Sequence, residues 1–213
     1  MFKKISLILS LLPKLGYWNV AYMIWYRISM RLGWRKRKFP LGEAVKGPFF
    51  NESIPVNNYP KAWKAQTLKK GNQILKGNLV WFHYHRFQVG NPPNWFKNPF
   101  DRSVLNNPKK HWTELNDFDL NTGDVKILWE PSRFDWLTDL ARAYRVFGDK
   151  NYFETINNWL QDWSKHNPKN QGPNWKCGQE VAIRLMKLIS TAQILDQDLE
   201  ASSALIKMSF EHV

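Results

Sequence analysis

Apolar residues recur every three or four positions in the last third of the chain, which is the spacing of one helix face. One such stripe covers residues 137–144 and a second covers residues 153–163. Pro131 is well placed to begin the first helix and Gly148 to end it, and Asn167-Pro168 ends the second. The short connection at Gly148 predicts an antiparallel helix pair.

The helical spacing continues to the C-terminus. A third helix is predicted to begin near Trp175, with an apolar face made of Val181, Leu185, Leu188, Ala192 and Leu195 and widened by Ala182, Met186 and Ile189. A fourth is predicted over residues 199–213, where apolar positions keep helical spacing up to Val213. Because natural domains rarely finish on an uncapped apolar turn, we expect this chain to be part of a longer domain.

The first half of the chain predicts loops more than regular structure. GNPPNWFKNPF (90–100) contains three prolines and three asparagines, which argue against a helix or strand there. LVWFHYHRF (79–87) predicts a strand or a buried extended segment, with His83 and His85 on one face. Two histidines without a third ligand are a weak metal signal, so we expect no metal site and no cofactor.

The N-terminal segment has its own pattern. Residues 17–32 predict a helix with one apolar face, formed by Trp18, Ala21, Tyr22, Trp25, Ile28 and Leu32, and WRKRK follows at 34–38. Two interpretations stay open: a helix packed on the domain with a solvated basic tail, or peripheral contact with an anionic membrane surface through residues 1–40. The apolar run at 5–12 is too short to span a membrane, and no clear cleavage site follows it.

Charge divides the chain in the same place. Of the formal net charge of +13, residues 1–40 carry nine cations and no acid, so residues 41–213 carry only +4. This distribution leaves residues 1–40 as the place where nucleic acid would bind, and because no recognition motif is present there we do not expect nucleic acid as a partner. The 12 tryptophans exceed what a core of this size needs, so we expect a few to line a groove. Cys177, the one cysteine, excludes an intrachain disulfide and a cysteine-based zinc site.

A charged pair stands out on the third predicted helix. Glu180 and Arg184 are i,i+4 neighbours with the acid first, they are flanked by apolar residues, and Asn174-Trp175 lies just ahead of them. A similar group, ILWEPSRFDW (127–136), precedes the first helix. One interpretation is a surface ion pair worth a few tenths of a kcal/mol. The other is a pocket in which Glu180 holds Arg184 against an anionic ligand near a helix N-terminus.

These motifs, in this order, resemble the N-terminal domain of heparinase II/III-like polysaccharide lyases. The resemblance is carried by NPPNWFKNPF, by W-E-x-x-R at 129–133, by the helix pair ending in Asn167-Pro168, and by N-W-x-x-x-x-E-x-A-x-R at 174–184. It implies a mainly α fold, a partial (α/α) toroid of antiparallel helix hairpins with a loop-rich first half, over residues 41–213. It also implies a periplasmic location.

The resemblance also implies a chemistry, β-elimination on uronic-acid polysaccharides of the heparan or alginate kind. That reaction needs a group to neutralise the uronate carboxyl, a base and an acid. In the family the neutralising Asn commonly precedes a His, and the chain has no Asn-His step, so we expect the catalytic positions beyond residue 213. The expected substrate-binding residues, with an acidic polysaccharide as partner, are Arg133, Asn174, Trp175, Glu180 and Arg184.

Two alternatives remain beside this expectation. The same five residues would also serve to join successive helix hairpins without touching a ligand. For the protein as a whole, the alternative to a lyase is a non-catalytic protein that binds glycans or assists surface-polysaccharide assembly.

Overall fold

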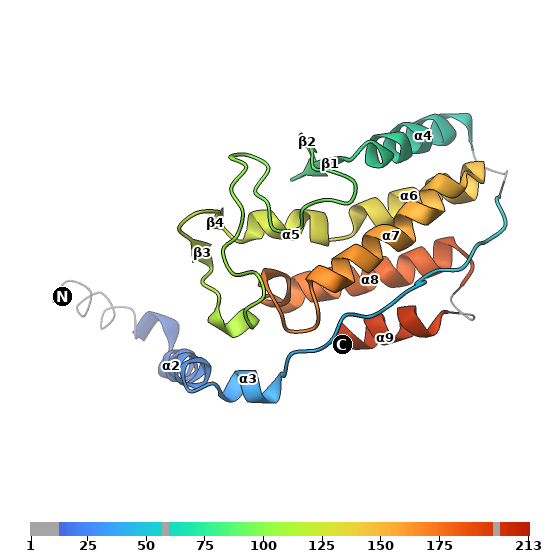
Figure 1. Ribbon diagram of the computed structural model, residues 1–213. Helices are drawn as coiled ribbons and strands as arrows, with labels where there is room; N and C mark the ends of the chain where they lie inside the picture. The colour runs from blue at the N-terminus through green and yellow to red at the C-terminus, as the bar shows by residue number, and fades with distance from the viewer. Residues whose placement is uncertain (1–12, 57–59, 198–200) are drawn as a thin grey trace. The chain divides into compact units, whose positions relative to one another are not determined.

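The computed structural model describes residues 13–56, 60–197 and 201–213. The chain separates into two compact units, Met1–Pro40 and Leu41–Val213, and each is described by itself. In the described residues there are eight α-helices, α2 to α9, and two short antiparallel strand pairs (Figure 1). The predicted mainly α class is therefore confirmed, while closure of the hairpins into a toroid stays a prediction.

The described part of the first unit, residues 13–40, contains two helices, α2 and α3, joined by a tight turn. Helix α2 (Tyr17–Arg31) confirms the predicted N-terminal helix, and α3 (Trp34–Lys38) holds the basic cluster. Gly33 adopts φ 72° between them, a left-handed conformation that glycine takes without strain. In the part of the chain that the structure describes, none of the helices has the length and apolar character needed to cross a bilayer.

The second unit has a layer of three neighbouring helices. Helix α6 (Asp135–Phe147) packs against α4 (Lys61–Leu75) and against α8 (Gly178–Ile194). Helix α7 (Lys150–His166) returns antiparallel to α6, which confirms the predicted pair, and α9 (Ser203–Glu211) follows α8 (Figure 1). Helices α6 and α7 thus bury most of the apolar stripes that the sequence pattern predicts at 137–144 and 153–163.

An extended segment, residues 42–51, links α7 to α9. Its backbone N–H groups donate to polar side chains of α7, with Val45 N 2.8 Å from Ser164 Oγ and Phe49 N 2.8 Å from Asn157 Oδ1. On the other side, Ser202 Oγ donates to the Phe49 carbonyl at 2.6 Å. Because side chains satisfy these backbone groups, the segment lies along α7 without belonging to a sheet and buries Val45, Phe49 and Phe50.

The predicted start of the first body helix is wrong. Pro131 lies inside a separate short helix, α5 (Lys126–Ser132), and α6 begins only after Phe134, which has φ 63°. A proline there leaves the Ile127 carbonyl without its helical donor. The Trp81 indole supplies a substitute, because its Nε1 donates to Ile127 O at 2.9 Å. The predicted ends hold: Gly148 has φ 68°, and α7 stops before Asn167.

Helix α8 has a different buried face from the predicted one. A 3₁₀ turn, η2 (Pro173–Trp175), comes first, and the helix begins at Gly178. Its buried residues are Glu180, Arg184, Leu188, Thr191 and Ala192, whereas Met186 and Ile189 are exposed. Glu180 and Arg184 therefore face inward, because each of them has hydrogen-bond partners inside the unit. The predicted fourth helix is shorter, and residues 198–200 lie outside the described ones.

The loop-rich first half contains more structure than the sequence pattern indicated. Helix α4 was not predicted, and residues 79–87 form a hairpin of β1 (Asn78–Trp81) and β2 (His85–Gln88) instead of one strand. A second pair, β3 (Phe118–Asp119) with β4 (Gly123–Asp124), follows the 3₁₀ turn η1 (Trp112–Glu114). Residues 90–100 are irregular, as predicted.

Most tryptophans of the second unit lie in the core. Their rings pack edge to face, as Trp159 does on Trp95 and Trp136, with centroids 6.4 and 5.1 Å away. Each buried indole N–H finds an acceptor on another segment, such as Asp162 for Trp95 and the Ser132 hydroxyl for Trp163. Their abundance is thus explained mainly by packing, and Trp18, Trp25, Trp34 and Trp63 are the exposed ones.

Gly71 permits the closest helix contact of the α4 packing. A Cβ at this position would lie 2.9 Å from Ala143 Cβ and 2.9 Å from Tyr152 Cε1. Gly71→Val should therefore lower the free energy of unfolding by about 1–3 kcal/mol through overpacking. Ala65→Val, on the exposed face of the same helix, is the matched control. Urea denaturation of both variants measures the difference, and equal losses would contradict the close-packing argument.

Candidate functional site

Arg133 joins the two charged motifs that the sequence singled out. Its Nε and Nη2 donate to Glu180 Oε2 and Oε1, each at 2.7 Å, which is a bidentate pair. Its Nη1 also donates to Glu130, and Glu130 Oε2 accepts from the Phe82 backbone N–H at 2.9 Å. One guanidinium therefore connects the end of α5, the first turn of α8 and the tip of the β1–β2 hairpin.

Local structure places these charges well. Arg133 caps the C-terminus of α5 and Glu180 lies in the first turn of α8, so each charge complements its helix dipole. The carboxylates of Glu130 and Glu180 are almost fully buried, whereas the Arg133 side chain keeps 31 % of its surface exposed. Hydrogen bonding to Glu180 is the main cause that raises the pKa of Arg133, so this cation stays charged throughout the working pH range.

Arg184 forms a second, fully buried centre. Its guanidinium carbon lies 5.2 Å from the ring centroids of both Trp163 and Trp175. Nη2 donates to the Asn174 carbonyl at 2.7 Å, and Nε donates to His212 Nε2 at 3.0 Å. Burial lowers the pKa of Arg184 to about 9, which leaves it a cation at neutral pH, stabilised by two aromatic rings and two acceptors.

His212 completes this centre from the end of α9. Its Nδ1 lies 2.8 Å from the Met208 carbonyl, so Nδ1 carries the proton and Nε2 is free to accept from Arg184. Burial, together with the Arg184 charge, lowers the pKa of His212 to about 3. His212 is therefore neutral. Sequence reasoning missed it, because nothing in its neighbourhood signals a partner 28 positions away.

The expected pairing of Glu180 with Arg184 is wrong. Both oxygens of Glu180 bond to Arg133, and Arg184 turns toward His212 and Asn174 instead. The alternative of an i,i+4 surface pair is equally wrong, since Glu180 and Arg184 are buried. Of the five predicted site residues, Arg133 is partly exposed, and Asn174, Trp175, Glu180 and Arg184 are each at most 8 % exposed.

Asn174 has an unsatisfied atom. Its Nδ2 donates to Asn167 Oδ1 at 2.7 Å, while its Oδ1 is buried and has no hydrogen-bond partner among the described residues. The Asn167 carbonyl in turn accepts from Trp175 Nε1 at 3.1 Å. The turn before α8 is thus fixed by side chains from the end of α7, which places the start of α8 firmly beside α5.

Beside the Glu130–Arg133–Glu180 network lies a groove of about 420 Å³. One wall is the β1–β2 hairpin, with Val80, His83 and Arg86, and the floor includes Glu130 and Pro131. Helices α4, α6 and α8 supply the other walls, which carry Lys70, Gln73, Asp135, Thr138, Asp139, Arg142 and Lys187. Glu130 is the one group shared by the buried network and the groove.

Most charges in the groove are paired with one another. Lys187 Nζ lies 2.6 Å from Asp135, and Asp139 accepts from Lys70 and Arg142 at 3.4 and 3.5 Å. Arg86 differs, because in the described part of the chain no acidic side chain forms an ion pair with its exposed guanidinium. The groove thus offers one available bidentate donor next to His83.

The hairpin tip is held in an unusual conformation. Phe82 and His83 have φ values of 51° and 70°, a left-handed region that costs non-glycine residues energy. The bond from Phe82 N to Glu130 holds this turn at the groove. Because His83 lies in the turn and His85 in β2, the two histidines do not share one strand face as predicted. A glycine-free turn gave no hairpin signal in the sequence.

The heparinase II/III N-terminus family model matches residues 47–200, more than half of the chain, including the groove lining, Arg133 and Arg184 but not His212. The chain belongs to this family. No curated protein and no solved structure matches it. This heparinase II/III N-terminal domain is accordingly related to polysaccharide lyases, with polysaccharide as the indicated binding partner. Within the described residues, no group of three or more His, Cys, Asp or Glu side chains is arranged to hold a metal ion.

The neutral state of His212 predicts a pH dependence of stability. Its pKa is about 3 when folded and about 6.5 when unfolded, so the unfolded chain binds the extra proton between these values. Stability should fall as pH drops below about 6.5, by up to about 1.4 kcal/mol per pH unit from this group. Urea denaturation of wild type and His212→Gln between pH 7 and 4 measures the effect, which is the difference between the two slopes. Parallel pH profiles would contradict a buried neutral histidine.

The buried carboxylate of Glu180 predicts a large contrast with an exposed one. Glu180→Gln should lower the free energy of unfolding by about 2–4 kcal/mol, because Arg133 keeps its charge and loses its bidentate partner. Glu52→Gln removes an exposed partner of Lys150 and should change stability little. Thermal unfolding of both variants checks this, and similar melting temperatures would refute the structural role of Glu180.

Proposed function

We propose that this domain binds an acidic, uronic-acid-containing polysaccharide in the groove beside the β1–β2 hairpin. The observation that carries the proposal is the exposed Arg86 guanidinium, which faces the groove with no acidic partner among the described residues. Guanidinium is the side chain best suited to a bidentate bond with a sugar carboxylate. Family membership supports polysaccharide as the ligand class.

The groove suits a chain of sugars better than a small compact ligand. It is bordered by the hairpin and three helices, and its paired lysines and arginines expose polar surface for hydroxyl groups. Its acids are already neutralised by these cations, so the carboxylates of a uronate polymer meet little repulsion. We infer that Arg86 sets the register by binding one carboxylate and that His83 contacts a neighbouring sugar.

The five residues singled out in the sequence take two roles in this proposal. Arg133 does not line the groove but keeps 31 % of its side-chain surface exposed, so it is available to a ligand that extends past the groove lining. Glu180, Arg184, Asn174 and Trp175 act from the interior, by fixing α5 and α8, which carry Glu130 and Lys187 into the groove walls.

We propose β-elimination as the reaction that this binding serves. In β-elimination a base removes the C5 proton of a uronate, a C4=C5 double bond forms, and the C4–O bond breaks with its electron pair leaving on O4, which an acid protonates. A cation beside the carboxylate lowers the activation barrier for removal of the C5 proton, because it stabilises the negative charge that develops on the carboxylate. Arg86 has that capacity at the carboxylate it binds, and none of the residues described here is assigned the role of base or acid.

Arg86→Ala should weaken binding of alginate and heparan sulfate oligosaccharides by about tenfold or more, because a charge-assisted bidentate pair is lost. Calorimetric titration of the full chain measures this. Lys109→Ala is the control, since it removes an exposed charge that is not part of the groove lining. The same oligosaccharide with its carboxyl groups reduced to alcohols should bind wild type and Arg86→Ala equally weakly. Equal affinity of wild type for the native and reduced sugars would refute the uronate site.

A further inference from the structure

Helix α2 exposes an apolar surface that is unusual for a protein in water. The exposed large side chains of α2 and its C-cap are Tyr17, Trp18, Tyr22, Met23, Ile24, Trp25, Ile28 and Leu32. At 100° per residue, most of them fall within one arc of less than half the helix circumference. A contiguous apolar patch of this kind marks a surface that contacts another phase or another molecule.

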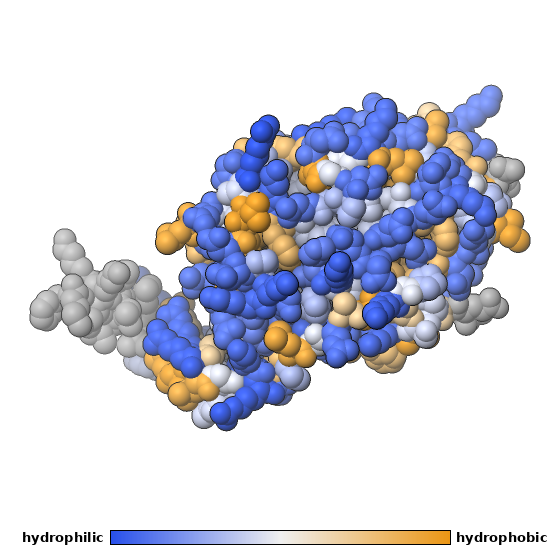
Figure 2. Space-filling model, in the orientation of Figure 1, coloured by the Kyte–Doolittle hydropathy of each residue, from blue (hydrophilic) through white to orange (hydrophobic). Residues whose placement is uncertain are grey.

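The surface beside this stripe is cationic. Arg27 and Arg31 lie on α2, and α3 contributes the run Trp34–Lys38 with four basic residues. The whole segment 1–40 contains no acidic residue. Figure 2 shows hydrophobic and hydrophilic surface next to each other on the segment that Figure 1 labels α2 and α3. Such a surface complements a partner that is apolar inside and anionic outside.

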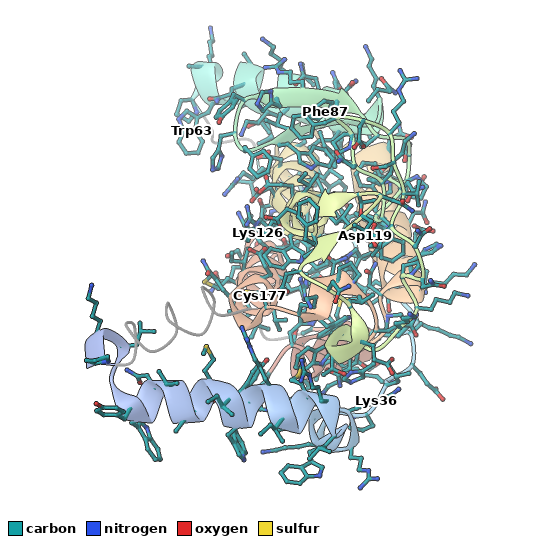
Figure 3. The ribbon with its side chains drawn as sticks, turned by 90° about the vertical axis from the view of Figure 1, so that its left-hand side faces the viewer. Lys36, Trp63, Phe87, Asp119, Lys126 and Cys177 are labelled. Carbon is teal, nitrogen blue, oxygen red and sulfur yellow. The ribbon has the colours of Figure 1, made fainter. Side chains whose placement is uncertain are left out.

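Contacts between α2 and α3 hold the basic residues of α3 beside the apolar stripe of α2. The left-handed turn at Gly33 folds α3 back, and the Arg35 guanidinium lies 4.8 Å from the Tyr26 ring centroid and 5.5 Å from that of Trp25. Arg35 Nε also donates to Ser29 Oγ at 3.4 Å. Figure 3 shows α2 along its length, with side chains projecting from it and Lys36 labelled on α3.

We propose that α2 and α3 bind the surface of an anionic phospholipid bilayer, with the tryptophan stripe of α2 inserted at the headgroup level. Tryptophan and tyrosine favour this depth because their rings are apolar and their N–H or O–H groups reach water. The basic residues meet the lipid phosphates and carboxylates. The helix lies in the interface and does not cross it, consistent with its 15 residues. A bilayer fits better than nucleic acid, because nucleic acid gives eight exposed apolar side chains no apolar phase to enter.

The test is flotation of the full chain with two kinds of vesicle. One kind contains phosphatidylcholine alone, and the other contains about one third phosphatidylglycerol, an anionic lipid. Partitioning onto the anionic vesicles should be about tenfold or more stronger, since each cation near the surface contributes a few-fold. Trp18→Ala with Trp25→Ala should weaken this binding about tenfold. Trp63→Ala, an exposed tryptophan of the other unit, should leave it unchanged.

Charge variants separate the two parts of the interaction. Arg31→Gln, Arg37→Gln and Lys38→Gln together should remove most of the preference for anionic vesicles, whereas Lys61→Gln, Lys109→Gln and Lys110→Gln should not. Binding that survives loss of both tryptophans and is competed away by duplex DNA would overturn the proposal in favour of a polyanion site. Absence of vesicle binding by the wild-type chain would also overturn it, and neither result would affect the polysaccharide groove.

Discussion

The second unit depends on one buried charge arrangement, the bidentate pair between Arg133 and Glu180. A carboxylate that is almost fully buried needs a cation, and the pairing of Glu180 with Arg133 holds the end of α5 against the start of α8. Glu130 extends the arrangement to the hairpin tip through the Phe82 N–H. Three segments far apart in sequence thus share one electrostatic requirement, and the groove lies where they meet.

Arg184 shows the same principle with a different solution. A buried guanidinium without a carboxylate is stabilised by two tryptophan faces, a backbone carbonyl and a neutral histidine. The contact of His212 Nδ1 with the Met208 carbonyl fixes the tautomer of His212, which leaves Nε2 as the acceptor for Arg184. A protonated histidine would present a donor and a second positive charge, which explains why acid should loosen the contact between α8 and α9 specifically.

The sequence predicted the helices whose boundaries depend on local chemistry and failed where tertiary partners decide. Gly148 ends α6 because glycine adopts the left-handed φ of 68° without strain. Helix α7 ends before Asn167 because the residue before a proline disfavours the helical conformation. Helix α4 was missed because its buried positions are Gly71 and Ile74, too few to form an apolar stripe. Glu180 and Arg184 were correctly singled out as unusual, but an i,i+4 spacing says nothing about Arg133 or His212, whose approach is set by how the hairpins pack.

The groove could not be predicted for a related reason. Its most distinctive group, Arg86, stands in β2, and its position depends on a turn at Phe82 and His83 that lacks glycine and asparagine. That turn is held by Glu130, a residue the motif W-E-x-x-R had marked on other grounds. The Glu130 carboxylate therefore has two roles. It pairs with Arg133 in the buried network, and it holds the turn of the β1–β2 hairpin, which carries Arg86 in the groove wall. A change of Glu130 would reach both the packing of α5 on α8 and the shape of the groove, so the buried network and the proposed binding surface form one mechanical unit.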